Sequence, residues 1–397
     1  MFKDVYIVSA ARTAVGNFGG SLRDVSAIEL GTITAKEALK RAGLTGAEID
    51  EVIFGNVGQY GLNAFLARLV SLNAGIPNAA TAQTVNRMCA SGLQAVVTGA
   101  LLLEHGEAET VLVGGSENMS QYPYYLPQAR WGMRMGVAHD GLLDALTVAL
   151  CEPVTGVDQH VAITAENIAR RYGMTREQID AYAMDTQGRA LRAIAEGKFR
   201  EEIVPVEVRQ NRQTVTFDTD EHPRQTTMEQ LARLKPILGP DTLITAGNAS
   251  GIDDAAAALV LMTGKAVRKH GCKPLARLVD FACAGVDPMY MGLGPVEATR
   301  KALAKTGLKA GDFGVVELNE AFASQAMACI RELALDPALV NPNGSGIALG
   351  HPLGATGAII TVKLLYEMAR RKARYGLASL CIGGGQGMSA VFERMGD

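Results

Sequence analysis

The segment KEALKRAGLTGAEIDEVIFGN, residues 36–56, recurs in altered form as RKALAKTGLKAGDFGVVELNE, residues 300–320. Each copy has an alanine- and leucine-rich stretch that stops at a glycine, followed by a short run rich in β-branched residues. This order predicts a helix that ends at the glycine and then a buried strand. The identities keep one register over the whole segment, which indicates an internal duplication. The matched pairs are Ala38 with Ala302, Leu39 with Leu303, Gly43 with Gly307, Leu44 with Leu308 and Val52 with Val316.

The same alternation of strands and helices extends to both sides of the two segments. In the first half we expect strands at 5–9, 51–54 and 110–113 and helices at 27–42 and 90–103. In the second half we expect strands at 275–281, 315–318 and 377–382 and helices at 295–305 and 354–370. This βαβα order predicts an α/β fold in which helices cover both faces of a sheet.

Residues 122–246 differ in character from the two halves. They contain the tyrosine cluster YPYYL, the only tryptophan, a long charged helical stretch and a polar strand pair around IVPVEV and QTVTF. We therefore interpret the chain as an N-terminal half (1–121, completed by 247–273), an inserted loop domain (122–246) and a C-terminal half (274–397). Ligand sites favour domain junctions, so an insertion between duplicated halves is well placed to cover one.

Composition excludes several classes of protein. The chain has 397 residues, 48% of them apolar, and a formal charge of −3, so we expect no nucleic-acid partner. The sequence has no run of about 18 apolar residues, which excludes a membrane span. The opening MFKDVYIVSAARTA lacks the basic and apolar regions of a signal peptide, and the six cysteines form no CxxC pair. We therefore expect reduced thiols in the cytoplasm and no metal site.

Cys89, in VNRMCASGLQAV (85–96), stands just before the predicted helix at 90–103. The unpaired N–H groups and the positive dipole end of that helix favour a thiolate, the nucleophilic form of cysteine. His351, in NGSGIALGHPLGATGA (343–358), occupies the corresponding place before a helix of the second half. The duplication thus predicts that the two residues face one cleft. The alternatives are a small buried core cysteine and a hydrogen-bonded histidine in a turn.

Two further motifs stand at the ends of predicted strands. Cys381 begins CIGGGQGMS, where a glycine triplet offers backbone N–H groups that suit an oxyanion. A phosphate-binding loop is disfavoured there because GGGQGM misses the GxGxxG spacing. Asn319, in ELNEAFA, has a side-chain amide that is suited to hold a water molecule or a carbonyl group in a cleft. The alternatives are an ordinary strand cysteine and an asparagine that caps the next helix.

Taken together and in order, CASGLQA, NEAFA, GHPLGATGA and CIGGGQGM resemble the thiolase family, and the resemblance covers essentially the whole chain. It implies a thiolase-like fold, in which the duplicated halves pack as a layered α/β/α/β/α core. It also implies reversible CoA-dependent cleavage of a 3-ketoacyl-CoA, whose reverse is a Claisen condensation. The second cysteine separates this chain from the related ketoacyl synthases, which have a histidine or an asparagine there.

The resemblance assigns a role to each residue of the motifs. Cys89 is implied as the nucleophile that takes the acyl group, and Cys381 as the acid and base for proton exchange. His351 would activate Cys89 and, with a water held on Asn319, donate to the thioester oxygen. The backbone N–H groups of Cys89 and Gly383 would form a second oxyanion hole.

Coenzyme A and acetyl-CoA are the implied substrates, and no permanently bound cofactor is expected. The resemblance places seven further positions along the CoA and acyl pocket: His160, Arg224, Ala246, Ser250, Met291, Ala321 and Phe322. It also implies a homodimer or homotetramer, with QARWGMRMG (128–136) joining the dimers. The chain departs from the usual pattern at His160-Val161-Ala162 and at GQYGLNAFLAR (58–68), which leaves the acyl chain length open.

Four functions therefore remain for comparison. The leading one is acetyl-CoA acetyltransferase acting on acetoacetyl-CoA, and the nearest alternative is a longer-chain 3-ketoacyl-CoA thiolase of fatty-acid degradation. A cysteine hydrolase would use Cys89, His351 and Asn319 but leave Cys381 without a role. An inactive CoA-binding scaffold would need none of the four side chains.

Overall fold

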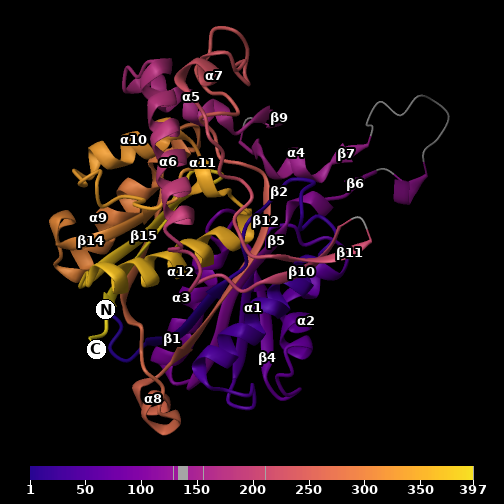
Figure 1. Cartoon of the computed structure of the whole chain (residues 1–397), viewed down its shortest axis with the longest axis vertical. Coiled ribbons are helices and arrows are strands. Elements are labelled where there is room, and N and C mark those ends of the chain that lie inside the picture. The colour runs from indigo at the N-terminus through magenta and orange to yellow at the C-terminus, as the bar shows by residue number, and fades with distance from the viewer. Residues whose placement is uncertain (128, 133–141, 155, 211, 397) are drawn as a thin grey trace.

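The computed structural model describes residues 1–127, 129–132, 142–154, 156–210 and 212–396. Over these residues a continuous mixed sheet organises the fold, in the order β14-β15-β16-β13-β1-β12-β5-β3-β4, with β2 beside β12 (Figure 1). The strands of the N-terminal part are β1 (Tyr6–Arg12), β2 (Gly16–Asn17), β3 (Glu51–Gly55), β4 (Thr81–Val85), β5 (Thr110–Asn118) and β12 (Asp253–Met262). Those of the C-terminal part are β13 (Ala276–Gly285), β14 (Phe313–Leu318), β15 (Tyr375–Ile382) and β16 (Gln386–Arg394).

Helices form three layers around the two parts of the sheet. On the outer face of the N-terminal part lie α1 (Ala27–Ala42) and α2 (Leu66–Asn73), which share a core with β3 and β12. On the outer face of the C-terminal part lie α9 (Gly294–Thr306) and α10 (Ala323–Glu332). Between the two parts lie α3 (Ser91–His105) and α12 (Leu353–Arg371), and α12 contacts α3, β5, β12, β14 and β15. This arrangement is the expected α/β/α/β/α core.

The two central helices cross at glycines. A Cβ placed on Gly92 of α3 would lie 2.5 Å from the Ala358 nitrogen of α12, and one on Gly357 would lie 2.3 Å from the Leu93 nitrogen. Glycine is required at both positions because any side chain would push the helices apart. The close crossing lies in the first turn of α3 and the second turn of α12, so the residues just before the two helices are also brought together.

The predicted elements are recovered with shifted ends. The helix at 27–42 has the expected bounds, with Ser26 accepting from the Glu29 N–H at its start and Gly43 in the left-handed conformation at its end. The strand predicted to stop before Gly114 instead continues to Asn118 as β5. Gly114 and Gly115 are close-contact positions there, since a Cβ on Gly115 would lie 2.4 Å from the Gly354 carbonyl oxygen.

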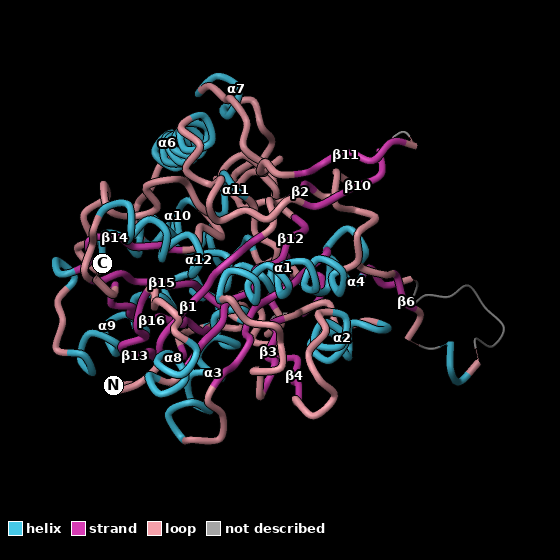
Figure 2. Tube along the Cα trace, turned by 60° about the horizontal axis from the view of Figure 1, so that its bottom comes forward, coloured by secondary structure: helices cyan, strands magenta, loops and turns pink. Residues whose placement is uncertain are grey.

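The inserted segment includes α6 (Arg176–Ala195) and α7 (Met228–Ala232), which lie toward the top of the view in both Figure 1 and Figure 2, and β6 (Tyr124–Tyr125), which lies at the right of both. Its polar strand pair forms the predicted hairpin of β10 and β11. Its elements are β6 (Tyr124–Tyr125), β7 (Leu143–Asp144), α4 (Ala145–Ala149), β8 (Cys151–Glu152), β9 (Gly156–His160), α5 (Ala162–Arg171), α6 (Arg176–Ala195), β10 (Val206–Gln210), β11 (Gln213–Phe217) and α7 (Met228–Ala232). The remaining helices are α8 (Gly264–His270), α11 (Gly346–Leu349) and the 3₁₀ turns Gly61–Phe65, Met119–Gln121, Ala129–Trp131, Pro288–Leu293 and Ala310–Asp312. Across the described ranges, no helix is both long and apolar enough to cross a bilayer.

Candidate active site

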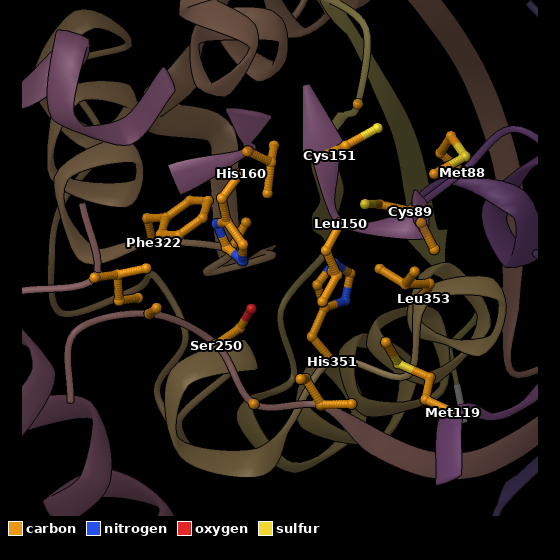
Figure 3. Close-up of a pocket in the computed structure, with 18 of the residues that line it drawn as sticks. Met88, Cys89, Met119, Leu150, Cys151, His160, Ser250, Phe322, His351 and Leu353 are labelled. Atoms are coloured by element: carbon orange, nitrogen blue, oxygen red, sulfur yellow. The ribbon is translucent and has the colours of Figure 1, made fainter. Parts of the chain in front are cut away.

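A cavity of about 810 Å³ lies where the two halves and the inserted segment meet (Figure 3). Cys89 reaches it from the N-terminal half, and His351 and Gly383 reach it from the C-terminal half. Figure 3 shows the Cys89 and His351 side chains directed into the same space. The duplicated halves thus place a thiol and an imidazole on one cavity, as predicted from their matching positions.

Cys89 is held in a tight turn just before α3. The Arg87 N–H donates to Ser91 Oγ at 2.8 Å, and the preceding Met88 has a positive φ of 45°. The Gly383 backbone N–H lies near enough to the Cys89 sulfur to lower the pKa of the thiol. Burial nevertheless raises the pKa of the Cys89 thiol to about 11. The prediction of a thiolate is therefore wrong, because desolvation of the sulfur outweighs the backbone N–H groups of Gly383 and Cys89.

His351 has a defined tautomer. Its Nδ1 lies 2.6 Å from Thr356 Oγ1, and that hydroxyl donates to the Pro352 carbonyl oxygen at 2.9 Å. Because the hydroxyl proton is used there, Nδ1 donates to Thr356 and Nε2 carries the lone pair. Burial lowers the pKa of His351 to about 4, so the ring is neutral near pH 7. The site thus pairs a protonated thiol with an imidazole that can accept its proton.

Asn319 lies directly after β14 and is completely buried behind His351. Its Nδ2 is 3.3 Å from His351 Nε2, and its backbone N–H donates to the Ser379 carbonyl oxygen. The next helix, α10, has no side-chain cap, which excludes the alternative that Asn319 caps it. The amide therefore contacts the imidazole nitrogen that carries the lone pair.

Cys381 lies near the end of β15, fully buried and packed with Met291 and Phe322 in one apolar cluster. Burial, together with the charge that a nearby Cys89 thiolate would carry, raises the pKa of Cys381 well above its usual value. The glycine triplet that follows is the turn between β15 and β16, with φ of 81° at Gly384 and 84° at Gly385. This turn, which only glycine adopts readily, presents the Gly383 N–H to Cys89.

Comparison with known proteins agrees with this geometry. The family model described as the thiolase N-terminal domain matches residues 5–265, and the model of the thiolase C-terminal domain matches residues 272–394. The chain belongs to the thiolase family.

Relatives of known name cover the whole thiolase chain. It is 49% identical to beta-ketothiolase BktB of Cupriavidus necator and 48% identical to an acetyl-CoA acetyltransferase of Syntrophomonas wolfei. Both matches cover 100% of this chain and 100% of the relative. The crystal structure of the Bacillus anthracis acetyl-CoA acetyltransferase matches with a TM-score of 0.96 at 43% identity, covering 99% of each chain. Human mitochondrial 3-ketoacyl-CoA thiolase in complex with CoA matches with a TM-score of 0.94 at 42% identity, covering 99% of this chain and 98% of that one. These matches confirm the thiolase fold.

The seven expected CoA and acyl positions all line the cavity: His160, Arg224, Ala246, Ser250, Met291, Ala321 and Phe322. The Ala162 N–H donates to His160 Nδ1 at 3.1 Å, which leaves the proton of the neutral ring on Nε2. Ser250 directs its hydroxyl into the cavity (Figure 3). Much of the segment 128–136, expected to join dimers, lies outside the described residues.

Sequence reasoning missed several polar residues that hold this site in place. Glu117, at the buried end of β5, accepts from the N–H groups of Val57 and Gly354 at 2.8 Å each, and so ties the two halves together. Burial raises the pKa of Glu117 to about 7. The available signal was a carboxylate within the otherwise apolar or small strand VLVGGSEN. Thr356 contacts the His351 ring, and Asp253 accepts from the His351 backbone N–H. No sequence pattern marks either residue, because each contact depends on how the chain folds.

Proposed function

We propose that this thiolase transfers an acyl group between CoA and Cys89, cleaving 3-ketoacyl-CoA in one direction and condensing two acyl-CoA molecules in the other. The observation that carries the proposal is the neutral His351 facing the same cavity as the Cys89 thiol, with the Gly383 N–H near the sulfur. A high thiol pKa beside a weakly basic imidazole disfavours a resting ion pair. Proton transfer is then coupled to attack on the substrate.

In the first half-reaction of condensation, the Cys89 sulfur attacks the thioester carbon of an acyl-CoA while His351 Nε2 takes the thiol proton. The backbone N–H groups of Cys89 and Gly383 stabilise the oxyanion that forms. As the carbon–sulfur bond to CoA breaks, the departing CoA sulfur takes a proton from the Cys381 thiol, while His351 keeps the Cys89 proton on Nε2. The products are free CoA and an acyl group on Cys89.

In the second half-reaction, the Cys381 thiolate left by this proton transfer removes a proton from the methyl carbon of acetyl-CoA. Its raised pKa makes that thiolate a strong base once formed. The Nε2 proton that His351 took from Cys89, together with a water held by Asn319, stabilises the resulting enolate oxygen. The enolate carbon attacks the acyl carbon on Cys89, the carbon–sulfur bond to Cys89 breaks, and the Cys89 sulfur takes its proton back from His351. Thiolysis is the same sequence in reverse.

We propose acetoacetyl-CoA as the substrate, because relatives over the full length include several named acetyl-CoA acetyltransferases. The cavity is also lined by Met88, Met119, Leu150 and Leu353, apolar side chains that suit a longer acyl chain. A longer-chain 3-ketoacyl-CoA thiolase is therefore the second candidate, supported by the similarity to the human 3-ketoacyl-CoA thiolase. We further propose that 122–246 acts as a CoA-binding insertion, and that the enzyme is a cytoplasmic homodimer or homotetramer.

The test is the rate of acetoacetyl-CoA consumption with and without added CoA. A thiolase consumes it only with CoA and forms acetyl-CoA, whereas a cysteine hydrolase acts without CoA and an inactive scaffold does not act. Measuring kcat/KM over 3-ketoacyl-CoA substrates of increasing length then separates the two thiolase candidates. The proposal requires strict CoA dependence, and consumption without CoA would contradict it.

A further inference from the structure

A carboxylate outside the motifs supports the backbone of His351. Asp253, the first residue of β12, is completely buried, and its Oδ2 accepts from the His351 backbone N–H at 2.8 Å. The preceding Gly350 has φ of 100°, and a Cβ there would lie 2.5 Å from the Asp253 carboxyl carbon. The loop that carries His351 therefore rests directly on this carboxylate.

The other carboxylate oxygen faces a histidine of the inserted segment. Asp253 Oδ1 lies 3.1 Å from His222 Nδ1, and Asn17 Oδ1 lies 2.8 Å from the same nitrogen. Asn17 is the partner of Asp253 in the pairing of β2 with β12, so both acceptors have fixed positions. Two acceptors on one ring nitrogen require that Nδ1 carries a proton. His222 thus donates to Asn17 Oδ1, and the same nitrogen lies within ion-pair distance of Asp253 Oδ1, a buried oxygen that has no hydrogen-bond partner among the described residues.

His222 also contacts the CoA side of the cavity. Its Nε2 lies 3.4 Å from Arg224 Nη1, and both residues line the same cavity as His351. In the neutral ring Nε2 is an acceptor, which suits the guanidinium N–H. A chain of polar contacts therefore runs from Arg224 through His222 and Asp253 to the backbone of His351.

We propose that His222 and Asp253 are positioning residues that couple the CoA-binding face of the cavity to the loop of His351. Asp253 fixes the position of the His351 imidazole relative to Cys89. His222 holds the Asp253 carboxylate in place and orients Arg224. The proposal rests on the proposed function for the roles of His351 and Arg224. Small displacements of a positioned base lower reaction rates strongly, so breaking the link slows proton removal from Cys89.

Two replacements of His222 separate its two contacts. His222→Asn keeps an N–H near the Nδ1 position, toward Asp253, but removes the partner of Arg224. His222→Gln keeps a polar group near the Nε2 position but removes the Nδ1 group that lies beside Asp253. We expect His222→Asn to raise KM for CoA severalfold with kcat within about twofold, and His222→Gln to lower kcat about tenfold.

The rate at which iodoacetamide alkylates Cys89, measured across pH 6–10, tests whether His222 and Asp253 affect the thiol. This measurement requires no thiolase turnover. We expect about tenfold slower alkylation in His222→Gln and in Asp253→Ala, and no further loss when the two are combined. Asp254→Asn is the matched control, because Asp254 is also a polar carboxylate at the start of β12 but accepts from Ser120 instead. We expect it to leave the alkylation profile within about twofold.

Melting temperatures identify any variant that fails to fold. If Asp253→Ala fails to fold, the two His222 variants alone test whether the contact with Asp253 affects Cys89. Equal alkylation profiles in wild type, His222→Gln and His222→Asn would overturn the proposal, as would full additivity of the two changes. If wild type shows no CoA-dependent turnover but Cys89 is still alkylated more slowly in the variants, the proposed function fails. The positioning role of His222 and Asp253 is then retained. If turnover is intact but the coupling is absent, the link alone fails.

Discussion

Gly92 of α3 packs against the backbone of Ala358 in α12 so closely that a Cβ on Gly92 would lie 2.5 Å from the Ala358 nitrogen. The two helices come from opposite halves of the duplicated chain. Cys89 stands before one helix and His351 before the other. This single close crossing therefore sets how far the thiol lies from the imidazole.

Replacing Gly92 should disturb both stability and reactivity. We expect Gly92→Ala to lower the free energy of unfolding by about 1–3 kcal/mol, because the added methyl meets backbone atoms that cannot move away freely. The rate of CoA-dependent turnover should fall with it. Gly311→Ala is the control, since a Cβ there meets nothing within 4 Å and Gly311 is not in the left-handed conformation. Equal melting curves for the two variants would contradict the packing account.

The tautomer of His351 should depend on the hydroxyl of Thr356. Thr356→Val keeps the shape of the side chain but removes the acceptor of the Nδ1 proton, so we expect kcat to fall about tenfold. Thr356→Ser keeps the hydroxyl and should retain most of the activity. Steady-state kinetics on folded variants of equal melting temperature provide the measurement. Similar kcat values in Thr356→Val and Thr356→Ser would rule out this role of the hydroxyl.

Acid should destabilise the protein partly through His351. Its folded pKa of about 4 lies below the ordinary value of 6.5, so the unfolded chain binds the proton more readily. The contribution is fully present above about pH 6.5 and is lost as pH falls toward 4, by about 3 kcal/mol at pH 4. Urea unfolding of wild type and His351→Asn at pH 7 and pH 4.5 measures it. We expect the variant to lose less stability between the two pH values, and an equal loss would contradict the neutral buried ring.

Local pattern was enough to predict the duplicated helices and strands, because helix ends, glycine stops and β-branched runs are signals carried by neighbouring residues. It was also enough to place Cys89 and His351 on one cleft. The pKa of Cys89 was mispredicted because the depth of its burial depends on how the cavity walls close around it. The support from Asp253 and His222 was not predicted, since those contacts join residues from distant segments and involve a backbone N–H that no sequence pattern marks.

The two cysteines should be separable by function. Cys381→Ala should still take an acetyl group from acetyl-CoA onto Cys89 but should lose condensation and thiolysis, because no thiolate remains to remove the methyl proton. Single-turnover acetylation and steady-state thiolysis, measured on the same preparation, check both halves of this expectation. Full condensation activity in Cys381→Ala would assign the proton transfer to another group.

The most direct test of the account is to locate the acyl group itself. Wild type and Cys89→Ser are incubated with acetyl-CoA, quenched in acid and digested, and the peptides are examined by mass spectrometry. We predict one acetyl group on Cys89 in wild type and none in a folded Cys89→Ser, whose hydroxyl ionises far less readily than a thiol. An acetyl group found on Cys151, Cys272, Cys283 or Cys329 and absent from Cys89 would contradict it.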